Sequence, residues 1–169
     1  MDFNMKNRND LLILSDEALA ALCELEFFKG SGPGGQKRNK SSSAVRVSLR
    51  QAPELAATDC TERSQHRNRA NALQKLRLLI ALRCRLEPPP PEQLIPLETS
   101  LSSPLYPLLA AQLLDIFTAC TCDHRQCAEI YRSAPTAWIK KVFRDKQLFQ
   151  EINRLRRDAG LPPFAAPGK

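Results

Sequence analysis

A glycine-rich loop followed by basic residues is the part of this sequence best suited to chemistry. It reads Gly30-Ser31-Gly32-Pro33-Gly34-Gly35-Gln36-Lys37-Arg38-Asn39-Lys40 and holds four of the six glycines in the chain. Glycine lets the backbone adopt positive φ values and approach a substrate closely, which a larger side chain would hinder. The polar side chain of Gln36 is expected to project from this loop. The pattern predicts a site in which backbone and amide groups act on a substrate.

Groups for acid–base catalysis are sparse. The two histidines, His66 and His124, lie in no pattern typical of a Ser-His-Asp or Cys-His site. A reaction at the loop is therefore expected to depend on positioning rather than on a general base. Ester hydrolysis by water meets this condition, because the ester carbonyl is already electrophilic. The remaining tasks are to place the water and to stabilise the developing oxyanion.

Positive charge is concentrated around the loop. The net charge of the chain is +7, but residues 29–85 contain 13 Lys or Arg against three acids, which gives this stretch +10 and the remainder −3. A basic region beside a neutral or acidic remainder is typical of a protein that meets a polyanion through one region. The alternative interpretation is a charged surface that only contacts solvent. The adjacent glycine-rich loop favours RNA binding over this alternative.

The loop resembles the catalytic Gly-Gly-Gln loop of class I peptide chain release factors. A Gly-Gly-Gln triplet alone could be an ordinary turn. Here the resemblance covers residues 21–85: it continues through Asn39, the serines at 41–43 and the strand-like run 44–49, and resumes at Arg63-Ser64-Gln65 and Asn68-Arg69. An unrelated glycine-rich loop is the alternative.

The resemblance implies a cofactor-free peptidyl-tRNA hydrolase that acts in the peptidyl-transferase centre of the ribosome. The backbone N–H of Gln36 would stabilise the reacting oxygen or the leaving 3′-hydroxyl, and its side chain would shape the pocket. Gly34 and Gly35 would aim this amide, so that all three residues are candidate catalytic residues. The candidate RNA-binding residues are Lys37, Arg38, Asn39, Lys40, Arg63 and Arg67. Lys37-Arg38 makes the loop more basic than is usual in the family.

The elements around the loop predict an α+β domain in which a short β-sheet packs on a long helix. Ser15 is expected to cap a helix that runs to about Leu22. Alternating apolar residues predict strands at 23–28, with Leu25 and Phe27 on one face, and at 44–49. Pro53 is expected to end the second strand, and residues 56–60 could add a third.

A long helix is predicted from about Ser64 to Arg85, with an apolar stripe that packs under the sheet. The stripe consists of Leu73, Leu76, Ile80 and Leu79. Four prolines at 88–91 then predict a spacer, because proline cannot continue a helix; a proline-rich ligand for another domain is the alternative. Further helices are expected at 104–117, 123–132, 136–143 and 145–158, with Gly160 stopping the last.

We therefore expect a Gly-Gly-Gln domain at residues 1–87, a proline-rich linker at 88–102, an all-helical appendage at 103–160 and a flexible tail at 161–169. The short helices around Ser133–Pro135 resemble a helix-turn-helix, but a small bundle with a core of Trp138, Ile139 and Phe143 is preferred. A phosphate-binding face could still form from Lys140, Lys141, Arg144, Lys146, Arg154, Arg156 and Arg157.

Cysteine usage leaves one further alternative. Cys120, Cys122, His124 and Cys127 could supply zinc ligands, but their spacing is not a standard paired knuckle. No metal is expected, and the thiols are predicted to be reduced. The N-terminal segment has no signal pattern, and no apolar run approaches the roughly 18 residues that span a bilayer. A soluble, cytoplasmic monomer without a membrane partner is therefore expected.

The predicted function is codon-independent peptide release from stalled ribosomes or large subunits, known as ribosome rescue. Classical release factors flank this domain with stop-codon-reading domains, for which the 169 residues leave no room. One rescue branch uses a basic C-terminal tail, which is not seen here, so the helical appendage is expected to bind ribosomal RNA, a helper protein or a split large subunit. A non-catalytic ribosome- or RNA-binding module and a DNA-binding regulator that uses the C-terminal helices are the alternatives.

Overall fold

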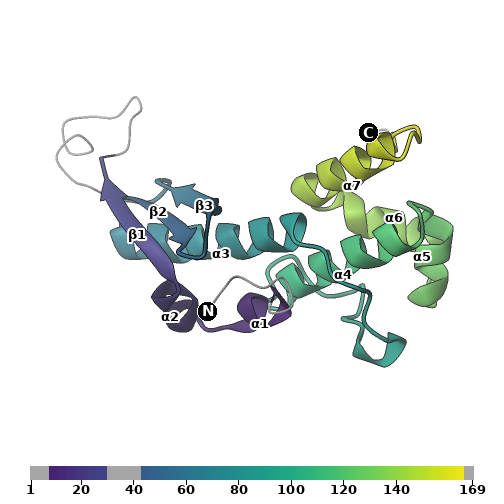
Figure 1. Ribbon diagram of the computed structural model, residues 1–169, viewed down its shortest axis with the longest axis horizontal. Coiled ribbons are helices and arrows are strands. Elements are labelled where there is room, and N and C mark those ends of the chain that lie inside the picture. Colours follow the sequence, from purple (N-terminus) through teal and green to yellow (C-terminus); the bar gives the residue numbers. More distant parts are fainter. Residues whose placement is uncertain (1–7, 30–42, 166–169) are drawn as a thin grey trace. The chain divides into compact units, whose positions relative to one another are not determined.

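A computed structural model of the chain describes residues 8–29 and 43–165. Contacts divide the chain into two compact units, Met1–Ile80 and Ala81–Lys169. The first unit contains a sheet and helices and the second is helical (Figure 1). The predicted α+β class, with a short sheet, a long helix and a helical appendage, is confirmed. Within the described ranges, no helix is long and apolar enough to span a membrane.

The sheet of the first unit is antiparallel, in the order β1-β2-β3. Its strands are β1 (Cys23–Phe28), β2 (Ala44–Leu49) and β3 (Ala52–Asp59). The predicted strands on either side of the glycine-rich loop are confirmed. They pair from Cys23 with Leu49 to Phe28 with Ala44. The segment between β1 and β2 therefore leaves and re-enters the sheet at adjacent positions.

The third strand is longer than expected, because Pro53 lies inside it. Ser48 of β2 pairs with Ala56, while the next residue, Leu49, pairs with Ala52, so three residues of β3 are accommodated at this irregularity. β3 is an edge strand of the described sheet, where the missing N–H of proline is tolerated. The prediction that Pro53 ends the second strand is wrong: β2 ends four residues earlier.

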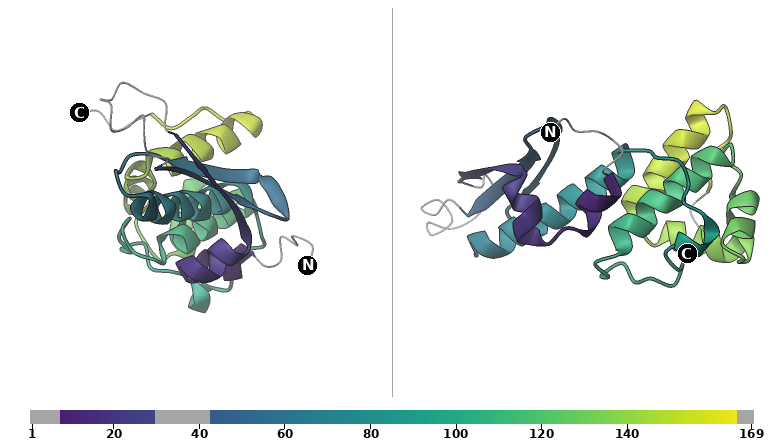
Figure 2. Two further views of the ribbon diagram at one scale, coloured as in Figure 1. Left: turned by 90° about the vertical axis from the view of Figure 1, so that its left-hand side faces the viewer. Right: turned by 60° about the horizontal axis from the view of Figure 1, so that its bottom comes forward.

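Among the described residues, the first unit also contains α1 (Arg8–Ile13), α2 (Asp16–Ala21) and α3 (Gln65–Arg83) as far as Ile80. The short α1 was not predicted from the sequence. The predicted cap of α2 is confirmed, since Ser15 Oγ accepts from Ala18 N at 3.2 Å. α3 lies along one face of the sheet (Figures 1 and 2). Leu73, Leu76 and Ile80 of its predicted stripe are fully buried.

The second unit contains the four predicted helices, α4 (Tyr106–Ala119), α5 (His124–Ile130), α6 (Pro135–Phe143) and α7 (Lys146–Asp158). α4 contacts α5 and α7, and α6 also contacts both. Trp138 of α6 is fully buried and stacks on Phe117 of α4, with ring centroids 5.4 Å apart. The predicted core position of Trp138 is confirmed, whereas Ile139 and Phe143 are only partly buried.

The proline-rich segment is hydrogen-bonded to α4. It contains one 3₁₀ turn, η2 (Pro91–Gln93). The buried side chain of Gln112 donates to Gln93 O at 3.1 Å and accepts from Ile95 N at 2.9 Å. Just ahead of this segment, Asp115 accepts from Leu86 N at 3.0 Å. These bonds satisfy backbone groups of a segment that has no regular ladder of its own.

Candidate functional site

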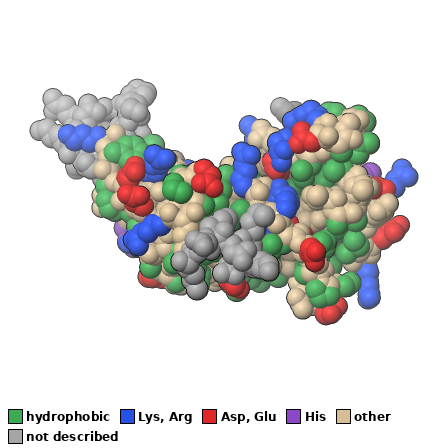
Figure 3. All heavy atoms as spheres, viewed as in Figure 1, with side chains coloured by type: hydrophobic (Ala, Val, Ile, Leu, Met, Phe, Trp, Pro, Cys, Tyr) green, Lys and Arg blue, Asp and Glu red, His purple; other side chains and the backbone are tan. Residues whose placement is uncertain are grey.

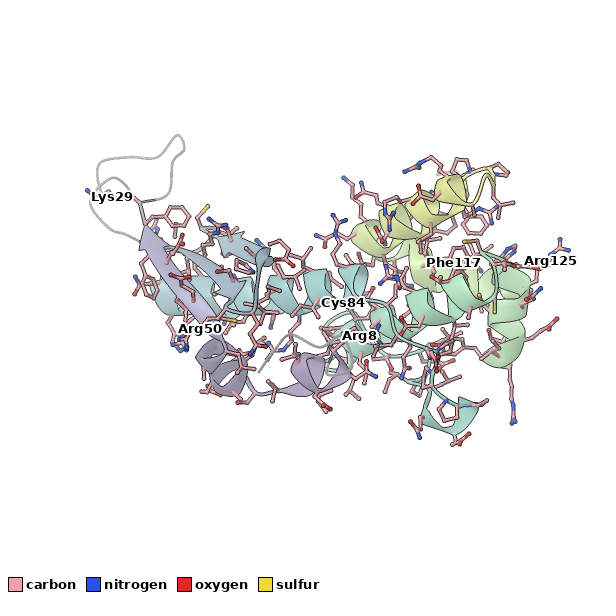
Figure 4. The ribbon with its side chains drawn as sticks, viewed as in Figure 1. Arg8, Lys29, Arg50, Cys84, Phe117 and Arg125 are labelled. Atoms are coloured by element: carbon pink, nitrogen blue, oxygen red, sulfur yellow. The ribbon has the colours of Figure 1, made fainter. Side chains whose placement is uncertain are left out.

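Most of the candidate site residues fall outside the described ranges. These are the candidate catalytic residues Gly34, Gly35 and Gln36 and the candidate RNA-binding residues Lys37, Arg38, Asn39 and Lys40. The structure does describe what flanks them, namely the end of β1 at Phe28, the start of β2 at Ala44 and the first turn of α3. Lys29 follows β1 directly and is exposed (Figure 4).

Asn68, in the first turn of α3, is fully buried and bonded to the residue that precedes β2. Its Nδ2 donates to Ser43 O at 2.6 Å and to Glu62 O at 2.9 Å. Its Oδ1 accepts from Glu62 N at 2.8 Å. One side chain thus joins the entry into β2, the turn after β3 and the start of α3. Asn68 was identified from the sequence only as part of the resemblance, and this set of bonds was not predicted.

Asp59 holds a second set of bonds at the end of β3. Its carboxylate accepts from Thr61 N at 3.0 Å, from Thr61 Oγ1 at 2.8 Å and from Lys75 Nζ at 2.6 Å. Burial opposes the charge of Asp59, but the hydrogen bonds from Lys75 and Thr61 outweigh it, so the pKa of this carboxyl is lowered. The residue is therefore ionised at neutral pH and ties α3 to the sheet.

The two candidate RNA-binding residues that the structure describes, Arg63 and Arg67, are both exposed at the start of α3. Ser64 caps this helix, since its Oγ accepts from Arg67 N at 3.3 Å. The Arg67 side chain is 74% exposed and lies 3.9 Å from Glu62. An ion pair this exposed contributes little to stability. Its guanidinium can therefore exchange Glu62 for a phosphate at small cost.

Exposed aromatic residues end β1. Phe27 is 50% exposed and Phe28 is 39% exposed. The register places Phe27 opposite the buried Val45, so it shares a face with Leu25 as predicted. Because β1 has only one neighbouring strand in the described sheet, its side chains are covered less than those of β2.

In the second unit, part of the predicted phosphate-binding face serves internal contacts. Lys141 donates to Thr99 O and lies over the Tyr106 ring, and burial lowers its pKa. Arg154 pairs with Glu151 and Asp158, and the Arg156 guanidinium lies 4.1 Å from the Phe164 ring centroid. The other four, which are exposed, are Lys140, Arg144, Lys146 and Arg157. On the face shown in Figure 3, basic side chains lie among acidic ones.

The cysteines of the predicted zinc alternative are buried in the second unit. Cys127 Sγ donates to Asp123 O at 3.1 Å. Burial, together with the neighbouring Cys120, raises the pKa of Cys127. Burial lowers the pKa of His124, whose ring meets Phe164 edge-on at 5.2 Å. In the described part of the chain, no group of three or more His, Cys, Asp or Glu residues could hold a metal ion.

Comparison with known proteins finds a similarity that covers most of the first unit and the residues just after it. The RF-1 domain matches residues 19–93. Peptide chain release factor 1 of Salinibacter ruber is 46% identical over 54 residues, which are 31% of this chain and 15% of that protein. Peptide chain release factor 2 of Bordetella pertussis is also 46% identical over 54 residues, 31% of this chain and 14% of that protein.

Peptide chain release factor 1 of Brachyspira hyodysenteriae is 39% identical over 70 residues, which are 41% of this chain and 18% of that protein. The chain thus spans less than a fifth of the length of these relatives. No solved structure matches it. The sheet, the first turns of α3 and the glycine-rich loop all fall inside the matched range. Residues 19–93 therefore match the RF-1 domain, and part of the chain is similar to peptide chain release factors 1 and 2.

Proposed function

We propose that this protein hydrolyses the ester bond of peptidyl-tRNA on the ribosome and so releases the nascent peptide. The observation that carries the proposal is the RF-1 domain at residues 19–93, which includes the triplet Gly34-Gly35-Gln36. The relatives that match this chain are named peptide chain release factors. The alternative, a non-catalytic RNA-binding module, gives no reason for this triplet within such a domain.

The proposed chemistry needs a donor for oxyanion charge rather than a protein nucleophile. The Gln36 backbone N–H stabilises the reacting oxygen or the departing 3′-hydroxyl, and the Gln36 side-chain amide restricts which nucleophile enters. Gly34 and Gly35 give the backbone the freedom to aim this N–H. Removal of one such donor costs about 2.7–4 kcal/mol of transition-state stabilisation. A water molecule supplies the nucleophile, and the tRNA hydroxyl leaves with a proton.

Basic residues on either side of the triplet hold the RNA. Lys37, Arg38, Asn39 and Lys40 follow the catalytic residues directly in sequence. Arg63, just before α3, and Arg67, in its first turn, are exposed and lie five residues and one residue before Asn68, which bonds to Ser43. Their charges pair with phosphates of ribosomal RNA or of the tRNA acceptor end, which position the domain without reading sequence.

We further propose that release does not depend on a stop codon. The unit that follows the domain is built from α4–α7 and has exposed cations on α6 and α7, among them Lys140 and Lys146. Such a unit can recognise ribosomal RNA, a helper protein or a separated large subunit. Stalled ribosomes and large subunits that carry peptidyl-tRNA are then the substrates, and the process is ribosome rescue.

The test is release of labelled peptide from stalled complexes that lack a stop codon, on whole ribosomes and on isolated large subunits. Gly35→Ala is expected to lower the maximal release rate by about a hundredfold or more, the scale of a lost oxyanion donor. Gln36→Ala is expected to be milder, because alanine keeps the backbone N–H. Binding without release, or release that Gly35→Ala leaves unchanged, contradicts hydrolysis and favours the non-catalytic module.

A further inference from the structure

The side chain of Asn68 uses its hydrogen-bonding groups on backbone partners from two other segments. Two carbonyls, of Ser43 and Glu62, face Nδ2, and the N–H of Glu62 faces Oδ1. These partners fix the orientation of the amide, because a carbonyl oxygen can only accept and an N–H can only donate. Aspartate has the same shape, but it would place a carboxylate oxygen against two carbonyl oxygens. The site is therefore selective for asparagine.

The bond to Ser43 connects residues that lie 25 positions apart. Ser43 immediately precedes Ala44, which pairs with Phe28 at the last rung between β1 and β2. Asn68 is fully buried, so its side-chain amide has no other described partners than these backbone groups, and loss of the side chain would remove all three bonds. The entry into β2 is thus held at two points, by the strand pair and by α3.

A glycine-rich segment has little intrinsic preference for one conformation, because each glycine has more accessible backbone states than other residues. Contacts at its two ends are therefore one means of restricting its geometry, beside the RNA contacts proposed for residues 37–40. Misplacement of a reacting group by about 1 Å can cost on the order of a hundredfold in rate. A rigid contact next to the segment is a suitable means of control.

We propose that Asn68 is a positioning residue for the catalytic loop. It sets the direction in which the chain enters β2 relative to the first turn of α3, where Arg67 is the adjacent residue. The proposal rests on the proposed function and assigns a role in it to a side chain that does not touch the substrate. Loss of this contact should lower the rate of the bound complex more than it weakens binding.

Single-turnover peptide release from stalled complexes tests the role, with the full-length protein titrated to saturation. Asn68→Asp is expected to lower the maximal release rate at least tenfold while the half-saturating concentration changes less than twofold. Lys75→Ala is the matched control, since Lys75 ties α3 to Asp59 without touching Ser43. It is expected to leave the maximal rate within twofold of wild type, even where its loss of thermal stability equals that of Asn68→Asp.

An unchanged maximal rate in Asn68→Asp, or an equal loss in Lys75→Ala, overturns the positioning role. If either result is found while wild type releases peptide and Gly35→Ala does not, the proposed function stands and only the role of Asn68 is rejected. If wild type releases none, the proposed function fails, and the role of Asn68 with it. If the Asn68 variants do not fold, hydrogen exchange of the Asn68 side-chain amide is measured in the wild type instead. Slow exchange is expected. Exchange as fast as that of an exposed amide contradicts the contact with Ser43 and with it the positioning role.

Discussion

Two buried polar side chains organise the part of the RF-1 domain from which the glycine-rich loop departs. Asn68 bonds across from α3 to the entry of β2, and Asp59 bonds from the end of β3 to Lys75 on α3. Neither contact leaves a periodic trace in the sequence, because each pairs a side chain with a partner distant along the chain. The glycine triplet and the exposed arginines could be identified from the sequence, because their residue types alone indicate a function. The contacts that Asn68 and Asp59 make could not be found in this way.

The lowered pKa of Asp59 predicts a pH-dependent contribution to stability. The carboxylate gains its bonds from Lys75 and Thr61 only in the folded state, so its folded pKa lies below the ordinary value near 3.8. Its contribution is present above that value and is lost as the pH falls through the folded pKa. Asp59→Asn should therefore lower the free energy of unfolding by about 1–3 kcal/mol at pH 7.

Urea unfolding of wild type and Asp59→Asn at pH 7 and near pH 3 checks this expectation. The difference between the two proteins should shrink at the lower pH, where wild-type Asp59 is increasingly protonated. Glu54→Gln, at an exposed position of β3, is a matched carboxylate control. A difference that is the same at both pH values would show that the charge of Asp59 is not the source of its effect.

At the scale of elements, hydrophobic periodicity located β1, β2, α3 and α4–α7 within a few residues of their observed bounds. These elements bury a face or a stripe against a core, and burial leaves a pattern in the sequence. The prediction that Pro53 ends a strand was wrong, because proline is tolerated in a strand that lies at the edge of a sheet, and the sequence does not show which strands are edges. The six-residue α1 was missed, since such a short segment carries too few turns for a period to be recognised.

The end of α7 at Gly160 was predicted from the sequence, because a glycine that follows a helix commonly ends it. Gly160 has φ +72°, with Gly160 N donating to Arg157 O and Leu161 N donating to Arg156 O. This pair of bonds is the Schellman arrangement, which needs a left-handed residue. A Cβ at Gly160 would meet nothing within 4 Å, so Gly160→Ala is expected to cost only the conformational term, about 1–2 kcal/mol.

Thermal and urea unfolding of Gly160→Ala and Gly160→Asn measure this cost. Asparagine tolerates the left-handed region better than alanine, so the asparagine variant should lose less stability. Peptide release should remain within twofold of wild type in both variants at a temperature where both are folded. Equal losses in the two variants would indicate that left-handed strain is not the cause.

At the scale of the whole molecule, charge is divided unequally along the chain. Residues 29–85 carry a net charge of +10 and the rest carries −3. In the second unit, Lys141, Arg154 and Arg156 are engaged in internal contacts, whereas Arg63 and Arg67 of the first unit are exposed. We therefore expect the RF-1 domain to supply most of the electrostatic affinity for the ribosome, and the helical unit to supply less.

Salt dependence of ribosome binding separates these contributions. Each phosphate contact that is lost lowers the slope of log K against log salt by about 1. The double variant Arg63→Ala with Arg67→Ala should weaken binding and reduce this slope by up to about 2, with little change in the release rate at saturation. Lys140→Ala with Arg144→Ala removes the same charge from α6 and its C-cap and should change the slope less. A larger change of slope in the Lys140 and Arg144 variant than in the Arg63 and Arg67 variant would mean that the helical unit makes the main ribosome contact, because the slope reflects the number of phosphates that are neutralised.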